Sequence, residues 1–277
     1  MTGMLDAHSL GGMVFLALVA GIAAAVNSIA GGGTLLTFPV LAALLPADPA
    51  RLVTANATST IGLWPGALTA AWAYRDDRAG QPPWARWLLL PSVIGAVAGS
   101  LLLLVLPPRL FDSLVPWLIL TAAVLFAAQP QVARLTARPR TPSGEADAAT
   151  AVGGGRIALA CGLQFLIAVY GGYFGAGIGI LMLAMLGGIG LGDIHRLNAV
   201  KNVLGTLVNG TAAGLFAIGP LLGSHDVSWP HAAVMAVAAA IGGLAGSHLA
   251  RRMPARTVRW LVSIIGFALA GYYFLVP

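Results

Sequence analysis

Residues 27–39 read NSIAGGGTLLTFP and interrupt a long run of the chain, 7–47, that contains no Asp, Glu, Lys or Arg. That run is 41 residues long, whereas a membrane-spanning helix needs ~20 apolar residues. A second charge-free run, 157–192, is 36 residues long and is interrupted by GGYFGAGIG at 171–179. Because clustered glycines weaken a helix, each run predicts a full-length helix, a glycine break and a short helix. The short helices are expected at about 34–45 and 178–189, either as thin spans or as re-entrant half-helices, which gives eight to ten membrane segments in all.

The rest of the chain contains six more charge-free runs of 18 to 24 residues, each of a length that fits one span. They are 52–74, 87–108, 113–133, 202–225, 227–250 and 260–277. The sequence therefore predicts an all-α polytopic membrane protein with eight full transmembrane helices and two short helices. Hydrophobic residues make up 58% of the chain and charged residues 9%, which excludes a soluble enzyme, a disordered protein and a nucleic-acid-binding protein.

The order of long and medium runs occurs twice along the chain, which indicates an internal repeat. IGAVAGSLL at 94–102 matches IGGLAGSHL at 241–249 in six of nine positions, and Arg51-Leu52 matches Arg196-Leu197. We therefore expect a first membrane repeat over 1–128, a linker over 129–156 and a second membrane repeat over 157–277.

The distribution of arginine predicts the orientation in the membrane. The linker contains Arg134, Arg138, Arg140 and Arg156, and basic loops stay on the cytoplasmic side of a membrane. Counting spans from the linker places both termini on the external side of the cytoplasmic (inner) membrane. The two repeats then enter the membrane from opposite sides, which is an arrangement that many secondary transporters use for alternating access.

Several motifs resemble those of the TauE/SafE sulfite-exporter-like permease family. In the first half they are NSIAGGGT at 27–34, followed by Phe38-Pro39, and TANATS at 54–59. In the second half they are GGYFGAGIG at 171–179, NAVKN at 198–202 and then Asn209. The resemblance implies export or uptake of small sulfur-containing or carboxylate anions, with no cofactor.

The candidate substrate site combines the two glycine breaks with polar side chains on the helices that follow them. A helix that starts inside a membrane presents unpaired N–H groups and a positive dipole end, which suit an anion. The expected substrate-binding residues are Asn27, Gly31, Gly32, Gly33, Thr34, Asn56, Thr58, Gly175, Gly177, Lys201, Asn202 and Asn209. We expect neither a catalytic nor a metal-binding residue.

Each of these features also has a purely structural interpretation. The glycines would allow close helix packing or a hinge, and the asparagines would form interhelical hydrogen bonds. Lys201, the only lysine of the chain, would extend its side chain to the cytoplasmic surface of the membrane. The GxxxG pairs Gly95/Gly99 and Gly242/Gly246 are expected to be packing faces, within one chain or in a homo-oligomer.

Two alternatives to a transporter follow from the sequence. GLGD at 190–193 matches the GxGD pattern of intramembrane aspartyl proteases, but that chemistry needs a second carboxylate beside Asp193. The charge-free runs contain no carboxylate, so we expect the protein not to be an enzyme. The other alternative is a membrane subunit that does not transport.

The predicted orientation can be tested by cysteine labelling after Cys161, the only native cysteine, has been replaced by serine. A membrane-impermeant maleimide added to intact cells is expected to label a His225→Cys variant and not a Glu145→Cys variant. Labelling both variants in permeabilised cells provides the control. The opposite pattern in intact cells would overturn both the orientation and the inverted repeat.

Overall fold

The computed structural model describes residues 10–30, 33–73, 82–136, 153–191, 194–249 and 255–275. Within these ranges the chain forms helices and loops, with no β-strand. The α-helices are α1 (Leu10–Ala30), α2 (Thr34–Leu44), α3 (Arg51–Ala73), α4 (Leu89–Val105), α5 (Pro108–Thr136), α6 (Gly154–Tyr173), α7 (Ile178–Gly188), α8 (Ile194–Ile218), α9 (Trp229–Leu249) and α10 (Ala255–Leu275). The 3-10 helix η3 (Pro83–Leu88) precedes α4, and η5 (Gly219–Leu222) follows α8.

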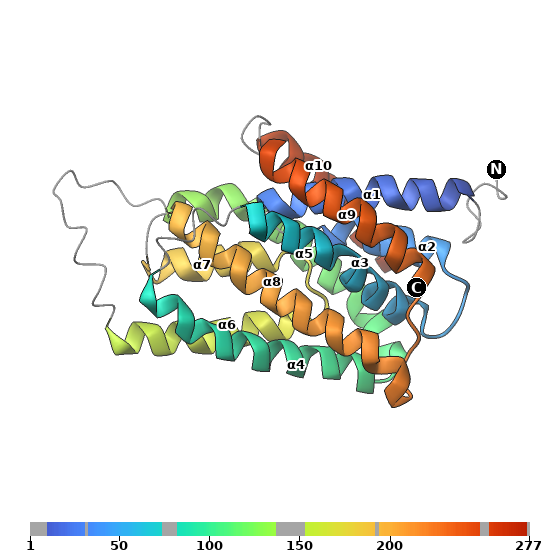
Figure 1. Cartoon of the computed structure of the whole chain (residues 1–277), viewed down its shortest axis with the longest axis horizontal. Coiled ribbons are helices and arrows are strands. Elements are labelled where there is room, and N and C mark those ends of the chain that lie inside the picture. Colours follow the sequence, from blue (N-terminus) through green and yellow to red (C-terminus); the bar gives the residue numbers. More distant parts are fainter. Residues whose placement is uncertain are drawn as a thin grey trace.

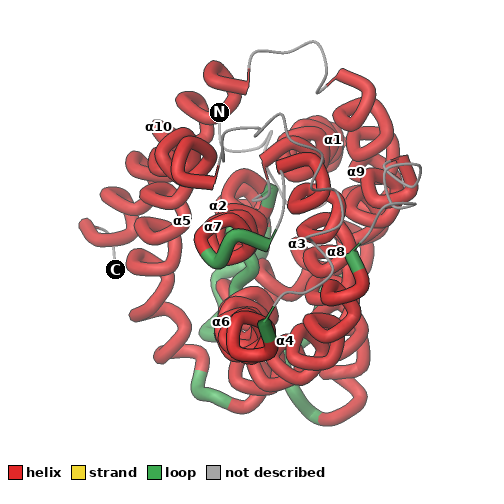
Figure 2. The backbone as a smooth tube through the Cα atoms, turned by 90° about the vertical axis from the view of Figure 1, so that its left-hand side faces the viewer, coloured by secondary structure: helices red, strands yellow, loops and turns green. Residues whose placement is uncertain are grey.

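The long helices lie roughly along one axis and run in both directions (Figure 1). Figure 2 looks along that axis and shows the short helices α2 and α7 in the middle of the bundle. On one side, α1, α9, α3, α8, α4 and α6 pack in that order, each against the next, and on the other side α5 packs against α10. The short helix α2 contacts α1, α3 and α10, whereas α7 contacts α5, α6 and α8.

The bundle has two ends, which we name after residues that lie there. The Leu10 end contains the start of α1 and the ends of α2 and α10, and the Gly154 end contains the end of α5 and the start of α6 (Figure 1). Helix α2 therefore runs from the middle of the bundle toward the Leu10 end, and α7 runs from the middle toward the Gly154 end.

In the described residues, six segments are long and apolar enough to cross a membrane. They are Leu10–Ser28, Pro83–Val105, Pro108–Gln131, Gly154–Tyr173, Arg196–Leu221 and Trp229–Gly246. Helix α3 is not among them, in keeping with its polar stretch TANATST at 54–60, and α10 contributes a shorter apolar segment, Trp260–Leu275. The two predicted short helices are confirmed to within one residue at each end. Each has 11 residues and is ~16 Å long, about half the hydrocarbon thickness of a bilayer.

Both GxxxG pairs are packing faces within this chain. Gly95 and Gly99 of α4 lie against the backbone of α6, and Gly242 and Gly246 of α9 lie against the backbone of α1. A Cβ atom at Gly99 would overlap the carbonyl oxygen of Val169. The absence of a side chain therefore allows these helix pairs to approach closely.

Replacing Gly99 by alanine is expected to lower the thermal stability of the purified protein. The added methyl group has to separate the α4 and α6 backbones, and overpacking of this kind typically costs ~1–3 kcal/mol. Gly162→Ala on α6 is the matched control, because a Cβ atom there meets no atom within 4 Å. If thermal unfolding shows the two variants to be equally stable, the close packing at Gly99 is wrong.

Candidate functional site

A polar pocket lies where α1, α3, α7 and α8 meet, and we call it the Lys201 pocket. Its lining residues are Asn27, Ser28, Ala67, Ala70, Ile178, Gly179, Lys201, Asn202, Gly205, Thr206 and Asn209. The cavity has a volume of about 40 Å³. Four of the predicted site residues are therefore brought together here, although they come from two halves of the chain.

The first turn of α7 forms one wall of this pocket. Gly177 precedes the helix with φ +80°, a left-handed conformation that glycine adopts without a steric penalty. The first backbone hydrogen bonds of the helix run from Ile180 and Leu181 to the Gly177 carbonyl. The N–H groups of Ile178 and Gly179 precede these bonds and have no acceptor within the helix. The positive end of the α7 dipole is therefore directed at the pocket.

Lys201 supplies the other positive charge of the pocket. Its side chain is only 3% exposed, so it is not extended to a membrane surface as a snorkelling lysine would be. No Asp or Glu is among the residues that line the pocket, and Lys201 has no ion pair with any described residue. Asn202 and Asn209 of α8 also line the pocket, and all of its polar side chains other than Lys201 are neutral.

Side chains of α3, α4 and α6 donate hydrogen bonds to the carbonyl groups at the second glycine break. The Asn56 amide donates a hydrogen bond to the Tyr173 carbonyl (3.0 Å), and the Ser100 hydroxyl donates one to the Gly172 carbonyl (3.2 Å). The Tyr170 hydroxyl donates to the Ala176 carbonyl (2.7 Å). Asn56 is thus fully buried as a support of the break and does not line the Lys201 pocket.

The other predicted residues of the first half lie away from the Lys201 pocket. Gly33 packs against the backbone of α1 at Ala23, and Thr34 begins α2. The Thr58 hydroxyl accepts a hydrogen bond from the Ser228 backbone N–H (3.1 Å) near the start of α9. Gly31 and Gly32 lie outside the described residues. In the second half, Gly175 has φ +82° and lies beside the side chain of Asn209.

Four residues that were not among the predicted substrate-binding residues also line the pocket: Ser28, Gly179, Gly205 and Thr206. Thr206 also joins α8 to α3, because its hydroxyl donates to the Ala67 carbonyl (3.3 Å) and its carbonyl accepts from the Trp64 indole N–H (3.3 Å). Thr206 follows Asn202 by four residues, so the two lie on the same helix face. Thr206 could therefore have been predicted from this spacing.

A larger outer pocket, of about 580 Å³, opens at the Leu10 end between α2, α3, α5 and α10. Asp48, Arg51, Asp112, Tyr272 and Tyr273 are its polar lining residues. Asp112 corrects the expectation that the spans lack carboxylates, because it lies within the candidate span Pro108–Gln131. One of its carboxylate oxygens is buried and has no hydrogen-bond partner among the described residues.

An aromatic cluster separates the outer pocket from the Lys201 pocket. The Phe38 ring contacts the rings of Phe174, at 5.5 Å between centroids, and of Phe111, at 6.3 Å. Tyr273, which lines the outer pocket, packs on Phe38 from one side. Phe174 precedes Gly175, which is beside Asn209 of the Lys201 pocket. The cluster therefore fills the bundle between the two pockets.

The chain is similar to several membrane proteins over nearly its whole length. A family model described as "Sulfite exporter TauE/SafE" matches residues 16–273. The "Probable membrane transporter protein ORF9" of a Sinorhizobium species is 30% identical over 93% of this chain and 90% of its own length. A "Probable membrane transporter protein" of Haemophilus influenzae is 25% identical over 94% of this chain and 93% of its own.

The "Probable membrane transporter protein YfcA" of Escherichia coli K12 is also similar, with 25% identity over 95% of this chain and 88% of its own. No solved structure matches the chain. The family match and the apolar spans agree on the class of protein. The chain is a multi-pass membrane protein that belongs to the sulfite exporter TauE/SafE family.

Proposed function

We propose that the protein is a secondary transporter of small anions, such as sulfite, organosulfonates or related sulfur-containing or carboxylate anions, across the cytoplasmic membrane. The observation that carries this proposal is the Lys201 pocket. A buried lysine and the unpaired N–H groups that begin α7 share this pocket, and no carboxylate lines it. An anion bound there would neutralise the Lys201 charge and interact with the positive end of the α7 dipole, in a region that water enters poorly.

The chemistry of the pocket also suits release of the anion. One lysine and one helix dipole attract an anion, while Asn202, Asn209 and Thr206 offer neutral hydrogen-bonding groups. A carrier must not hold its substrate too tightly, and a single cation among neutral groups meets that requirement. The volume of about 40 Å³ favours an anion of a few heavy atoms, or a pocket that widens when the anion enters.

The helix contacts support the further proposal that the eight long helices span the membrane as an inverted repeat. If α1 to α5 correspond to α6 to α10, then the contact of α1 with α9 has its counterpart in that of α6 with α4. The contact of α2 with α3 corresponds to that of α7 with α8. The α3–α8 contact and the α5–α10 contact each join a helix to its own counterpart in the other half. Such pairing is expected of two halves related by a pseudo-two-fold axis.

In this proposal the Leu10 end is external and the Gly154 end is cytoplasmic, as the arginine distribution predicts. The aromatic cluster around Phe38 then closes the anion pocket toward the outside. Transport requires that this cluster separate when α2 and α7 move relative to the surrounding helices. Asp193, the centre of the alternative enzyme, lies outside the described residues, and no carboxylate lines the Lys201 pocket.

Anion binding by the purified protein is expected to depend on the α8 side chains of the Lys201 pocket. In a thermal-shift panel of sulfite, thiosulfate, sulfonates and short carboxylates, at least one anion should raise the unfolding temperature of the parent protein. Asn202→Leu and Asn209→Leu should reduce that shift, because each removes a hydrogen-bonding group from the pocket.

The matched control for this panel is Thr58→Val, a polar residue of α3 that does not line the pocket. This variant should keep the anion-induced shift of the parent even if its own stability falls. Asparagine variants that fold and bind the anion as tightly as the parent would contradict the proposed site.

Lys201→Met is expected to stabilise the ligand-free protein and to abolish its response to anions. Methionine occupies a similar volume without the cost of burying an unpaired charge. Lys201→Arg provides the comparison, since it keeps the charge and should keep a measurable anion response. A lower unfolding temperature for Lys201→Met in the absence of ligand would show that Lys201 serves the fold and not the anion.

A further inference from the structure

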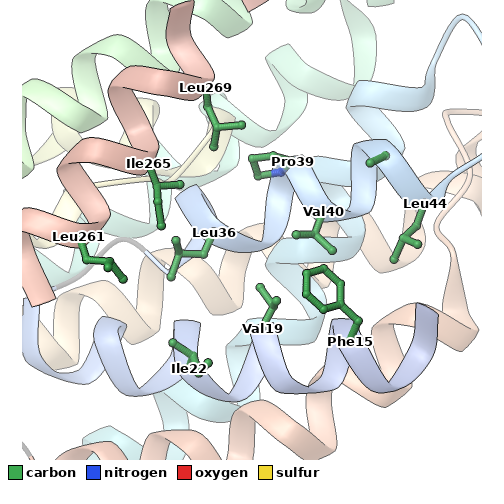
Figure 3. Close-up of a pocket in the computed structure, with 11 residues that line it drawn as sticks. Phe15, Val19, Ile22, Leu36, Pro39, Val40, Leu44, Leu261, Ile265 and Leu269 are labelled. Carbon is green, nitrogen blue, oxygen red and sulfur yellow. The ribbon is translucent and has the colours of Figure 1, made fainter. Parts of the chain in front are cut away.

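An apolar groove runs along the outer face of α2, between α1 and α10 (Figure 3). It has a volume of about 450 Å³, and every residue that lines it is apolar. Leu36, Val40 and Leu44 of α2 line its floor, and Phe15 and Leu261 stand on its two walls (Figure 3). Because Leu36 and Leu44 are eight residues apart on a helix, the floor is ~12 Å long.

The groove opens toward the bilayer and not toward water. Phe15 and Ile22 of α1 are 48% and 57% exposed, and Leu261 of α10 is 58% exposed. These side chains belong to the apolar segments Leu10–Ser28 and Trp260–Leu275. A floor of ~12 Å that ends at the Leu10 end matches the depth of about one bilayer leaflet, ~15 Å.

The groove adjoins the polar outer pocket, and Pro39, Ala43 and Leu269 line both cavities. In the outer pocket, Arg51 and Asp112 face the same space without forming an ion pair with each other. Asp48 adds a second carboxylate to the pocket. A polar cavity at the membrane surface thus lies beside an apolar cavity that extends toward the membrane centre, which is the same order as a lipid head group and its acyl chain.

We propose that these two cavities together bind one phospholipid that carries a primary ammonium group. The phosphate lies beside the Arg51 guanidinium, and the ammonium donates a hydrogen bond to the part of the Asp112 carboxylate that lines the outer pocket. One acyl chain fills the groove against α2. A peptide would bring unsatisfied polar groups into the groove, whereas a phospholipid matches both the apolar groove and the charged side chains of the outer pocket beside it.

This lipid would be a packing partner of α2. The inner face of that helix packs in the core through Leu35, Phe38 and Leu41, whereas its outer face has the groove. An acyl chain in the groove therefore replaces protein contacts that α2 lacks on this side, and its removal leaves an apolar void.

The full chain can be reconstituted in vesicles that contain phosphatidylethanolamine with a photoreactive diazirine on one acyl chain. Irradiation and peptide mapping should find the label on residues 34–44 of the parent protein. Val40→Trp should remove the label from α2 by obstructing the groove, and Arg51→Gln should reduce it by removing the phosphate partner. The matched control is Val237→Trp on α9, where the side chain is exposed outside the groove, and it should leave the α2 label unchanged.

Four results would overturn the proposal. The first is an absence of label on α2 in the parent protein, and the second is a label on α2 that persists in a folded Val40→Trp variant. The third is equal labelling of α2 by a phosphatidylcholine probe with the same acyl chain, because its quaternary ammonium cannot donate a hydrogen bond to Asp112. Labelling that rises as the protein is diluted in lipid would identify a second copy of the chain as the occupant and would also overturn it.

Discussion

A backbone that breaks inside a bilayer leaves N–H and C=O groups that no bulk water can satisfy, and this constraint organises the centre of the protein. At the second break, the carbonyl groups of Gly172, Tyr173 and Ala176 accept hydrogen bonds from Ser100, Asn56 and Tyr170. The protein itself therefore supplies the hydrogen-bond donors that these carbonyl groups need. The N–H groups at the start of α7 have no acceptors within the helix, and we propose that they bind the transported anion.

The two breaks are not used in the same way. At the first break the Thr37 and Ser59 hydroxyls lie 2.6 Å apart, and Thr37 also donates to the Gly33 carbonyl (3.4 Å). At the second break the helix start faces a pocket with Lys201. The aromatic cluster around Phe38 separates this pocket from the Leu10 end. In the proposed cycle, each half would adopt the conformation of the other, and the opening would then face the other side of the membrane.

Much of the architecture could be predicted because it depends on local sequence. Clustered glycines in charge-free runs located α2 and α7 to within one residue, and spacing along α8 brought Lys201, Asn202 and Asn209 together. The role of Asn56 could not be predicted, because its face of α3 does not reveal that the end of α6 is its neighbour. Asp112 was missed because α5 begins at Pro108, before the charge-free run that predicted this span.

The proposed transport requires an anion to bind between the start of α7 and Lys201, and anomalous diffraction from crystals grown with selenite can locate such an anion. Selenite resembles sulfite in shape and charge, and its selenium atom can be located without ambiguity. We predict an anomalous peak within hydrogen-bonding distance of the Ile178 and Gly179 N–H groups and of the Lys201 ammonium. A peak beside Arg51 alone, or no peak in crystals of a protein that transports selenite, would show that the anion does not bind at the start of α7.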